Sequence, residues 1–143
     1  MTGTKEDLIK YRMARAFDTY DDALILAERG KWNSTINRLY YSAYYAIMAL
    51  LLNADLKPTT HNGAKSSFSE YFIKTGIIEK EYGKIYSQLF TWRQKGDYDD
   101  LFDFDKDKVM EKRFYESKNQ SEESPTNDLA LLMIKYRQNW RYE

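Results

Sequence analysis

The chain has 143 residues, enough for one domain with a buried core that needs no disulfide bonds. It has no cysteine and a single histidine, His61, which excludes structural disulfides, thiolate catalysis, cysteine-based zinc sites and clusters of imidazole ligands. Because 22 basic residues balance 22 acidic ones, the overall charge does not draw the chain to nucleic acid or to a membrane surface.

The N-terminal segment is charged from its start, which is not typical of a signal peptide. The longest apolar run, residues 43–52, is far shorter than the roughly 20 residues that cross a bilayer. We therefore expect a cytoplasmic protein with no membrane partner. Thirteen tyrosines, seven phenylalanines and three tryptophans predict extensive aromatic packing, with a subunit interface as one place for it.

The first predicted helix begins at Thr4, because Thr4 and Asp7 approximate a capping box, and it ends at Gly30. Its apolar stripe comprises Ile9, Met13, Ala16, Tyr20, Ala23, Leu24 and Ala27. The short turn that follows predicts that the next helix runs back antiparallel beside it.

Residues 32–54 are predicted to form the central helix of a bundle, because they are apolar on nearly every face from Leu39 onward. The main face comprises Trp32, Ile36, Leu39, Tyr40, Ala43, Ile47, Leu50, Leu51 and Ala54. Arg38 and Ser42 interrupt this surface. A guanidinium on a buried helix needs an anionic partner, so we expect Arg38 to face a groove with an internal carboxylate or a ligand phosphate.

Pro58 ends the central helix, and Thr59 or Thr60 can cap a third helix that stops at Gly76. Its inward face is predicted to hold Ala64, Phe68, Tyr71 and Phe72. A fourth helix, about 79–95, is predicted to end at Gly96 and to turn inward Tyr82, Ile85, Tyr86, Leu89 and Phe90.

Two more helical segments are predicted beyond an acidic stretch, at about 105–118 and after Ser124-Pro125. No alternating strand pattern occurs. The sequence therefore predicts an all-α protein, an antiparallel bundle of four to six helices. We expect one domain over 1–143, with a core at about 4–100 and C-terminal helices at about 105–141.

The end of the fourth helix is the first candidate site. Arg93 can bind a phosphate in bidentate fashion and stabilise charge on a phosphorane, and Tyr98 can position or donate a proton. Alternatively, Arg93 pairs with Asp97 or Asp99 and only holds the turn.

The start of the third helix is the second candidate. His61 and Lys65 lie four residues apart beside exposed backbone amides, and together they could hold an anion. Local packing of His61 is the alternative. The aspartates between residues 97 and 107 lack EF-hand spacing, so we expect a solvated acidic loop and no metal site.

The third candidate combines Arg38 with a ladder of tyrosines at helical spacing, Tyr41, Tyr44 and Tyr45. Aromatic side chains of this kind can stack on nucleic-acid bases. A tyrosine stripe on a helix is also typical of a core or of a dimer interface, and this alternative stays open.

Three ordered segments of the chain resemble HEPN-domain proteins. Residues 38–46, RLYYSAYYA, resemble the central-helix pattern R-x-Y-Y-x-A-x-x-A, and residues 60–63 and 72–76 resemble T-H-x-G and F-x-K-T-G. Residues 93–98, RQKGDY, resemble an R-x-x-x-D-Y ending of the next helix. The resemblance covers about residues 30–100.

The resemblance implies a helical bundle that commonly forms a homodimer with a groove between subunits. Many members pair with a minimal nucleotidyltransferase in toxin–antitoxin or phage-defence systems. Some are metal-independent ribonucleases that use an arginine and a nearby histidine, without a cofactor. Arg93 matches the arginine, but Tyr98 stands where the histidine is expected. In one branch of the family a tyrosine beside the arginine is adenylylated by the partner, and Tyr98 matches that acceptor.

We therefore predict a HEPN-type member of a nucleotidyltransferase pair that binds nucleotide or RNA phosphate. Arg93, Asp97 and Tyr98 form the candidate catalytic set, with endoribonuclease activity left open by the missing histidine. Arg38, His61 and Lys65 are candidate phosphate-binding residues. The alternative is a non-catalytic dimeric interaction module, in which Arg93 and Asp97 are structural.

Overall fold

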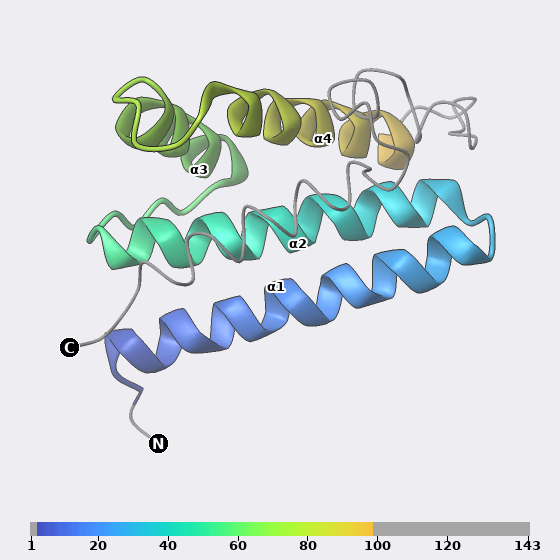
Figure 1. The fold of residues 1–143 in the computed structure, drawn as a ribbon, viewed down its shortest axis with the longest axis horizontal. Coiled ribbons are helices and arrows are strands. Elements are labelled where there is room, and N and C mark those ends of the chain that lie inside the picture. Colours follow the sequence, from blue (N-terminus) through green and yellow to red (C-terminus); the bar gives the residue numbers. More distant parts are fainter. Residues whose placement is uncertain (1–2, 99–143) are drawn as a thin grey trace.

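A computed structural model of the chain describes residues 3–98, which form four α-helices and one short π-helix (Figure 1). No strand occurs within these residues, which confirms the all-α prediction. The two helical segments predicted beyond residue 100, and the acidic stretch before them, lie outside the described residues.

The first two helices, α1 (Lys5–Glu28) and α2 (Trp32–Asn53), form an antiparallel hairpin (Figure 1). The predicted capping box is present: the Asp7 amide donates to Thr4 Oγ1 over 3.0 Å, and the Thr4 amide donates to Asp7 Oδ2 over 3.2 Å. Gly30 in the turn has a φ of 69°, which glycine adopts without steric cost.

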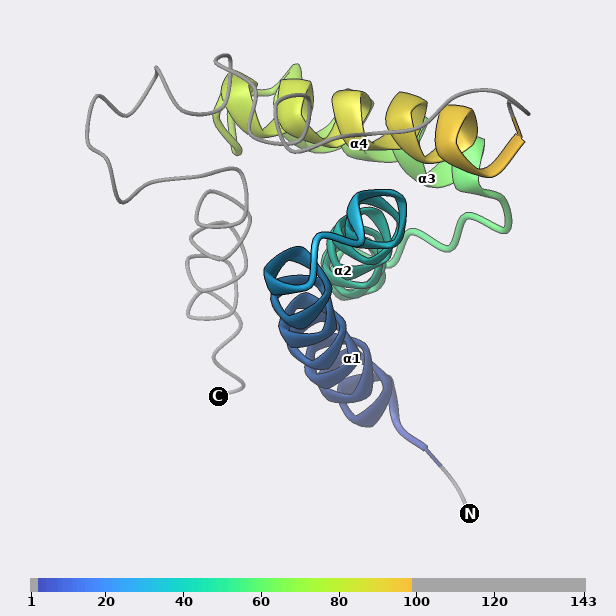
Figure 2. The ribbon, with the colours of Figure 1, turned by 90° about the vertical axis from the view of Figure 1, so that its right-hand side faces the viewer.

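The prediction that α2 is central is correct. In Figures 1 and 2, α1 lies on one side of α2, and α3 (His61–Phe68) and α4 (Lys80–Tyr98) lie on the other. On the α1 side, Ser42 Oγ donates to the Ala16 carbonyl over 2.7 Å, so this buried hydroxyl is satisfied. Leu24 was predicted to be buried but is 38% exposed, because it lies at the edge of the α1 stripe.

The third helix starts where predicted, since the Thr60 hydroxyl accepts from the Gly63 amide over 2.9 Å. After Phe68 the chain widens into the π-helix η1 (Ser69–Ile73), in which the Lys74 amide donates to the Ser69 carbonyl over 2.9 Å. The wider turn keeps Phe72 in line with Phe68, but it rotates Tyr71 out to 51% exposure. The prediction that Tyr71 faces inward is therefore wrong.

The helix α4 buries Tyr86, Leu89 and Phe90 as predicted, and it also buries Trp92 and Arg93. The prediction that Gly96 ends this helix is wrong, because α4 continues to Tyr98. Gly30 and Gly76 interrupt the chain with positive φ values of 69° and 80°, whereas Gly96 does not adopt such a φ. A helical glycine costs about 1 kcal/mol relative to alanine, which the packing of a long helix can offset.

Among the helices within residues 3–98, none combines the length and the apolar character that crossing a bilayer requires.

The contact between Ala16 and Ser42 requires α1 and α2 to approach closely, so Ala16→Leu should overpack the hairpin. We expect a loss of about 1–3 kcal/mol of unfolding free energy in urea denaturation. Ala14→Leu makes the same change on the exposed face of α1 and should alter stability by less than about 0.5 kcal/mol. Equal stability of the two variants would contradict this packing.

Candidate functional site

The contact between α2 and α4 is built around Tyr40, whose side chain is fully buried. The Arg93 side chain comes from α4 and is only 8% exposed. Its Cζ atom lies 4.8 Å from the centroid of the Tyr40 ring and 5.7 Å from that of Tyr41. These distances are typical of cation–π interactions, which strengthen when the cation is desolvated.

His61, the first residue of α3, reaches the same tyrosine from a third helix. Its Nδ1 atom lies 2.6 Å from Tyr40 Oη, a hydrogen-bonding distance. The imidazole also stacks on Tyr44, with 4.4 Å between ring centroids. The capping interaction of Thr60 fixes the first turn of α3, and with it the position of His61.

The hydroxyl groups of two tyrosines continue this contact into the core. Tyr86 Oη on α4 donates to Tyr40 Oη over 3.4 Å. Tyr40 Oη, which accepts from Tyr86, can donate its own proton to His61 Nδ1, or it can accept from Nδ1–H in the other tautomer of the imidazole. When Tyr40 donates, neutral His61 carries its proton on Nε2, which makes Nε2 a hydrogen-bond donor. We refer to Arg93, Tyr40, Tyr41, Tyr44, His61 and Tyr86 as the Tyr40 cluster.

The protonation states of the cluster follow from burial. Burial raises the pKa of Tyr40 and, more strongly, that of Tyr86, so both phenols stay neutral at pH 7. Burial lowers the pKa of His61 from 6.5, and the positive charge of Arg93 lowers it further. The imidazole is therefore neutral at pH 7, and the cluster carries the positive charge of its arginine.

The structure brings Arg93 and His61 together on Tyr40, although they lie in different helices. Arg38 also lies nearby, since its Cζ atom is 5.3 Å from the centroid of the Tyr41 ring, which it shares with Arg93. Nε and Nη2 of Arg38 donate to Asn37 Oδ1 over 3.0 and 2.7 Å. Within residues 3–98, Arg38 forms no ion pair, so the predicted internal carboxylate is not found there.

Lys65 does not join His61, although both residues lie in α3. Its Nζ atom lies 5.4 Å from the centroid of the Phe90 ring. Asp97 and Tyr98 occupy the last turn of α4, but their side chains lie outside the described part of the structure. The alternative in which Arg93 pairs with Asp97 or Asp99 therefore stays a prediction.

Sequence reasoning assigned Tyr40 and Tyr86 only to the core and so missed their role in positioning His61. One signal was available, because a buried tyrosine hydroxyl usually needs a hydrogen-bond partner. Within residues 3–98, no three histidine or acidic side chains are grouped so that they could hold a metal ion.

The fold and the cluster describe an all-α protein with a buried arginine at the contact between two long helices. Comparison with known proteins identifies the family. The family model for the HEPN domain matches residues 9–136. The chain belongs to the HEPN domain family, as the sequence motifs predicted.

Relatives come from bacteria and archaea. A UPF0332 protein of Thermotoga maritima is 38% identical over 107 residues, which cover 75% of this chain and 81% of the relative. A Methanocaldococcus jannaschii protein named "Putative toxin MJ0605" is 37% identical over 53% of this chain and 57% of its own length. A second protein of that organism, "Putative toxin MJ0142", is 31% identical over 54% of this chain and 53% of its own.

Because His61 is the only histidine, its titration can be followed by NMR without assignment ambiguity. We expect a pKa below 6.5, and a rise in that pKa in Arg93→Gln, since one of its two causes is removed. Arg38→Gln should leave it unchanged. The pKa in Arg93→Gln should still lie below 6.5, because burial remains.

The lowered pKa of His61 also makes the free energy of unfolding depend on pH. Unfolded chains bind a proton at His61 more readily than folded ones, so the free energy of unfolding should fall as pH drops through 6.5. In His61→Asn, urea denaturation between pH 5 and 8 should lack this contribution. A His61 pKa at or above 6.5 would contradict the proposed environment.

Proposed function

We propose that the chain is a toxin-like HEPN protein that binds the phosphate of a nucleotide or of RNA at the Tyr40 cluster. Arg93 is the phosphate clamp, and Arg38 and His61 line the same site. The observation that carries the proposal is the convergence of Arg93 and His61 on Tyr40. The names of two archaeal relatives, which contain the word toxin, agree with it.

Charge supports an anionic ligand. The guanidinium groups of Arg93 and Arg38 lie 5.7 and 5.3 Å from the same ring, that of Tyr41. The phenols of Tyr40 and Tyr86 are neutral, so they do not neutralise these cations. Two guanidinium groups beside one half-buried aromatic ring suit a phosphate, which arginine binds in bidentate fashion.

The hydrogen bonds of His61 also support phosphate binding. When Tyr40 donates to Nδ1, the Nε2–H of His61 is a donor that an anionic oxygen can accept. The neighbouring Tyr44 ring, stacked at 4.4 Å, keeps the imidazole plane in place. The site therefore offers a charged donor and a neutral donor in fixed positions.

Metal-independent cleavage of RNA is the second candidate function, and the closeness of an arginine to the single histidine favours it. In this reaction a ribose 2′-hydroxyl attacks the adjacent phosphorus, and the bond from phosphorus to the 5′-oxygen breaks. Proton abstraction from the hydroxyl would require His61 in its other tautomer, with the proton on Nδ1. Arg93 would stabilise charge on the phosphorane, and the abstracted proton would return to the 5′-oxygen.

Binding and cleavage of a labelled single-stranded RNA, with EDTA present, test both functions. Arg93→Gln should weaken RNA binding by roughly tenfold to a hundredfold, because a charge-assisted phosphate contact is lost. Cleavage, where wild type shows it, should fall by about 10²–10³ in rate. Arg29→Gln makes the same change on the exposed end of α1 and should leave both unaffected.

Thermal melts distinguish a role of Arg93 in RNA binding from a role in the stability of the fold. Arg93→Lys preserves the charge over the Tyr40 ring but not the bidentate geometry, so it should keep most of the stability and lose most of the binding. Unchanged RNA binding in Arg93→Gln, together with a lower melting temperature, would contradict the proposal. That result would favour the non-catalytic dimeric interaction module, which the burial of Arg93 also fits.

We extend the proposal to a homodimer and a nucleotidyltransferase partner, with Tyr98 as the residue that the partner modifies and Asp97 as its neighbour in the site. Purification of this chain from its native host, followed by intact mass measurement, should then show addition of AMP units. Tyr98→Phe should abolish the addition. An unmodified wild-type chain isolated together with a nucleotidyltransferase would contradict this extension.

A further inference from the structure

A second cationic region lies between α4 and the segment formed by α3 and the π-helix, and neither Arg93 nor His61 lines it. It is a pocket of about 460 Å³, within the usual size of small-ligand sites. Three lysines line it, Lys65, Lys80 and Lys84, and no aspartate or glutamate does. Within residues 3–98 none of these lysines forms an ion pair. The pocket therefore concentrates positive charge.

Neutral hydrogen-bonding groups complete this lining. Ser69, Ser87 and Thr91 contribute hydroxyl groups, and Gln88 contributes an amide. Phe68, Ile73 and Tyr86 form its apolar wall. Phe68 and Tyr86 are each only 2% exposed, so the accessible cationic and hydrogen-bonding groups are what a ligand meets, and they suit a compact, multiply charged oxyanion.

The π-helix gives independent support for a ligand site. Its ends, Ser69 and Ile73, both line the pocket. A π-turn is less stable than an α-turn and occurs frequently at functional sites. Gly83 of α4 packs directly against this turn, since a Cβ atom there would lie 3.2 Å from Ile73 side-chain atoms. The π-helix and α4 therefore pack closely at this edge of the pocket, and the π-helix is an uncommon backbone conformation.

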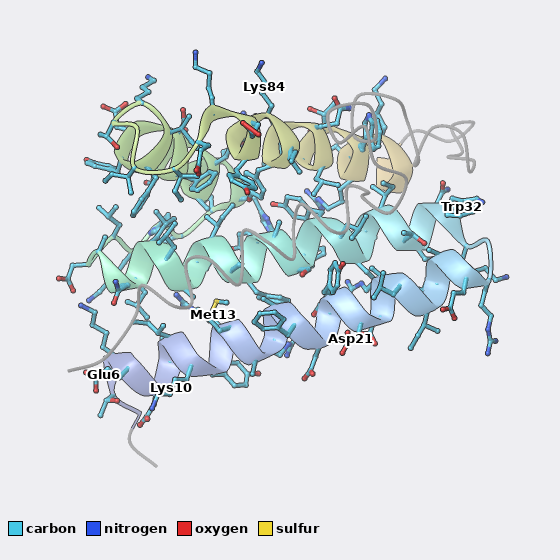
Figure 3. All side chains as sticks on the ribbon, in the orientation of Figure 1. Glu6, Lys10, Met13, Asp21, Trp32 and Lys84 are labelled. Atoms are coloured by element: carbon cyan, nitrogen blue, oxygen red, sulfur yellow. The ribbon has the colours of Figure 1, made fainter. Side chains whose placement is uncertain are left out.

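Lys84 of the pocket and Arg93 of the Tyr40 cluster lie on different sides of α4, although Tyr86 borders both. Lys84 and Arg93 are separated by nine positions, or roughly 180° around a helix at about 100° per residue. Figure 3 shows Lys84 pointing away from α2, whereas Arg93 contacts the α2 residue Tyr40. Neither Arg93 nor His61 lines the pocket. One small phosphate therefore cannot occupy both sites.

We propose that this pocket is a separate phosphate-binding site, with Lys65, Lys80 and Lys84 as its cationic groups. The phosphate belongs either to a free nucleotide or to the RNA backbone, because both offer the same oxyanion beside a flat base. In each case the ammonium groups bind the phosphate oxygens.

Binding of ATP, and separately of a 12-nucleotide polyuridine RNA, distinguishes these two sources. The variant Lys80→Glu/Lys84→Glu reverses two exposed charges of the pocket. The control, Lys10→Glu/Lys31→Glu, makes the same change at exposed lysines of α1 and of the turn before α2. Lys10 lies on α1, across α2 from the pocket (Figure 3).

We expect the pocket variant to lose roughly tenfold or more in affinity for its ligand, while the control keeps wild-type affinity within about twofold. If the ligand is RNA, the slope of log affinity against log salt should also shrink by about 1.4, since each phosphate contact contributes about 0.7 for single strands. Selective loss of ATP binding would identify a nucleotide site, and selective loss of polyuridine binding an RNA-backbone site.

The proposal is overturned if wild type binds neither probe, or if the pocket variant and the control bind alike. Circular dichroism must show that all variants are folded. In an Arg93→Gln background, Lys80→Glu/Lys84→Glu should cause the same loss of affinity as in wild type, because Arg93 does not line the pocket. The pocket can therefore hold a phosphate even if the Tyr40 cluster does not, and the two proposals can fail separately.

Discussion

The candidate site depends on the position of the Arg93 side chain over the Tyr40 ring, where α4 meets α2. A guanidinium that is 8% exposed has lost most of its hydration, and the ring at 4.8 Å offsets part of that cost. The same ring carries the hydroxyl that holds His61. Movement of the Tyr40 side chain would therefore disturb the arginine and the histidine together.

The central helix meets different neighbours on its two sides. Ser42, Ala46 and Ala49 lie at helical spacing on the α1 side, and their small side chains permit close approach of that helix. Tyr40 and Tyr44 face α3 and α4, where they contact His61. Small residues thus fix the hairpin, and large aromatic residues with polar groups build the site on its other side.

Most of the fold between residues 3 and 98 could be predicted from the sequence, because it follows from local signals. These signals depend only on residues that are close in sequence: they are the capping at Thr4 and Thr60 and the apolar periodicity of α2. The errors arose where local rules compete. The π-turn after Phe68 has no reliable sequence signature, and Gly96 remains within α4, whereas Gly30 and Gly76 adopt positive φ values.

The candidate site was harder to predict, because it depends on the distance between helices. Arg93 was found from its motif, but the sequence placed His61 in a different helix and gave no measure of how close the two residues come. Their meeting depends on Tyr40, whose role follows from a hydrogen bond across 21 positions. Spacing along a single helix cannot reveal such a contact.

Tyr86 connects the two cationic regions of α4. Its side chain forms part of the apolar wall beside the π-helix, and its hydroxyl donates to Tyr40, which in turn contacts His61. Because Tyr86 is 2% exposed, it has little room to move independently of its helix. The packing of α4 against the π-helix therefore also holds the Tyr86 hydroxyl that donates to Tyr40. One packing contact thus supports both the pocket wall and, through Tyr40, the position of the His61 imidazole.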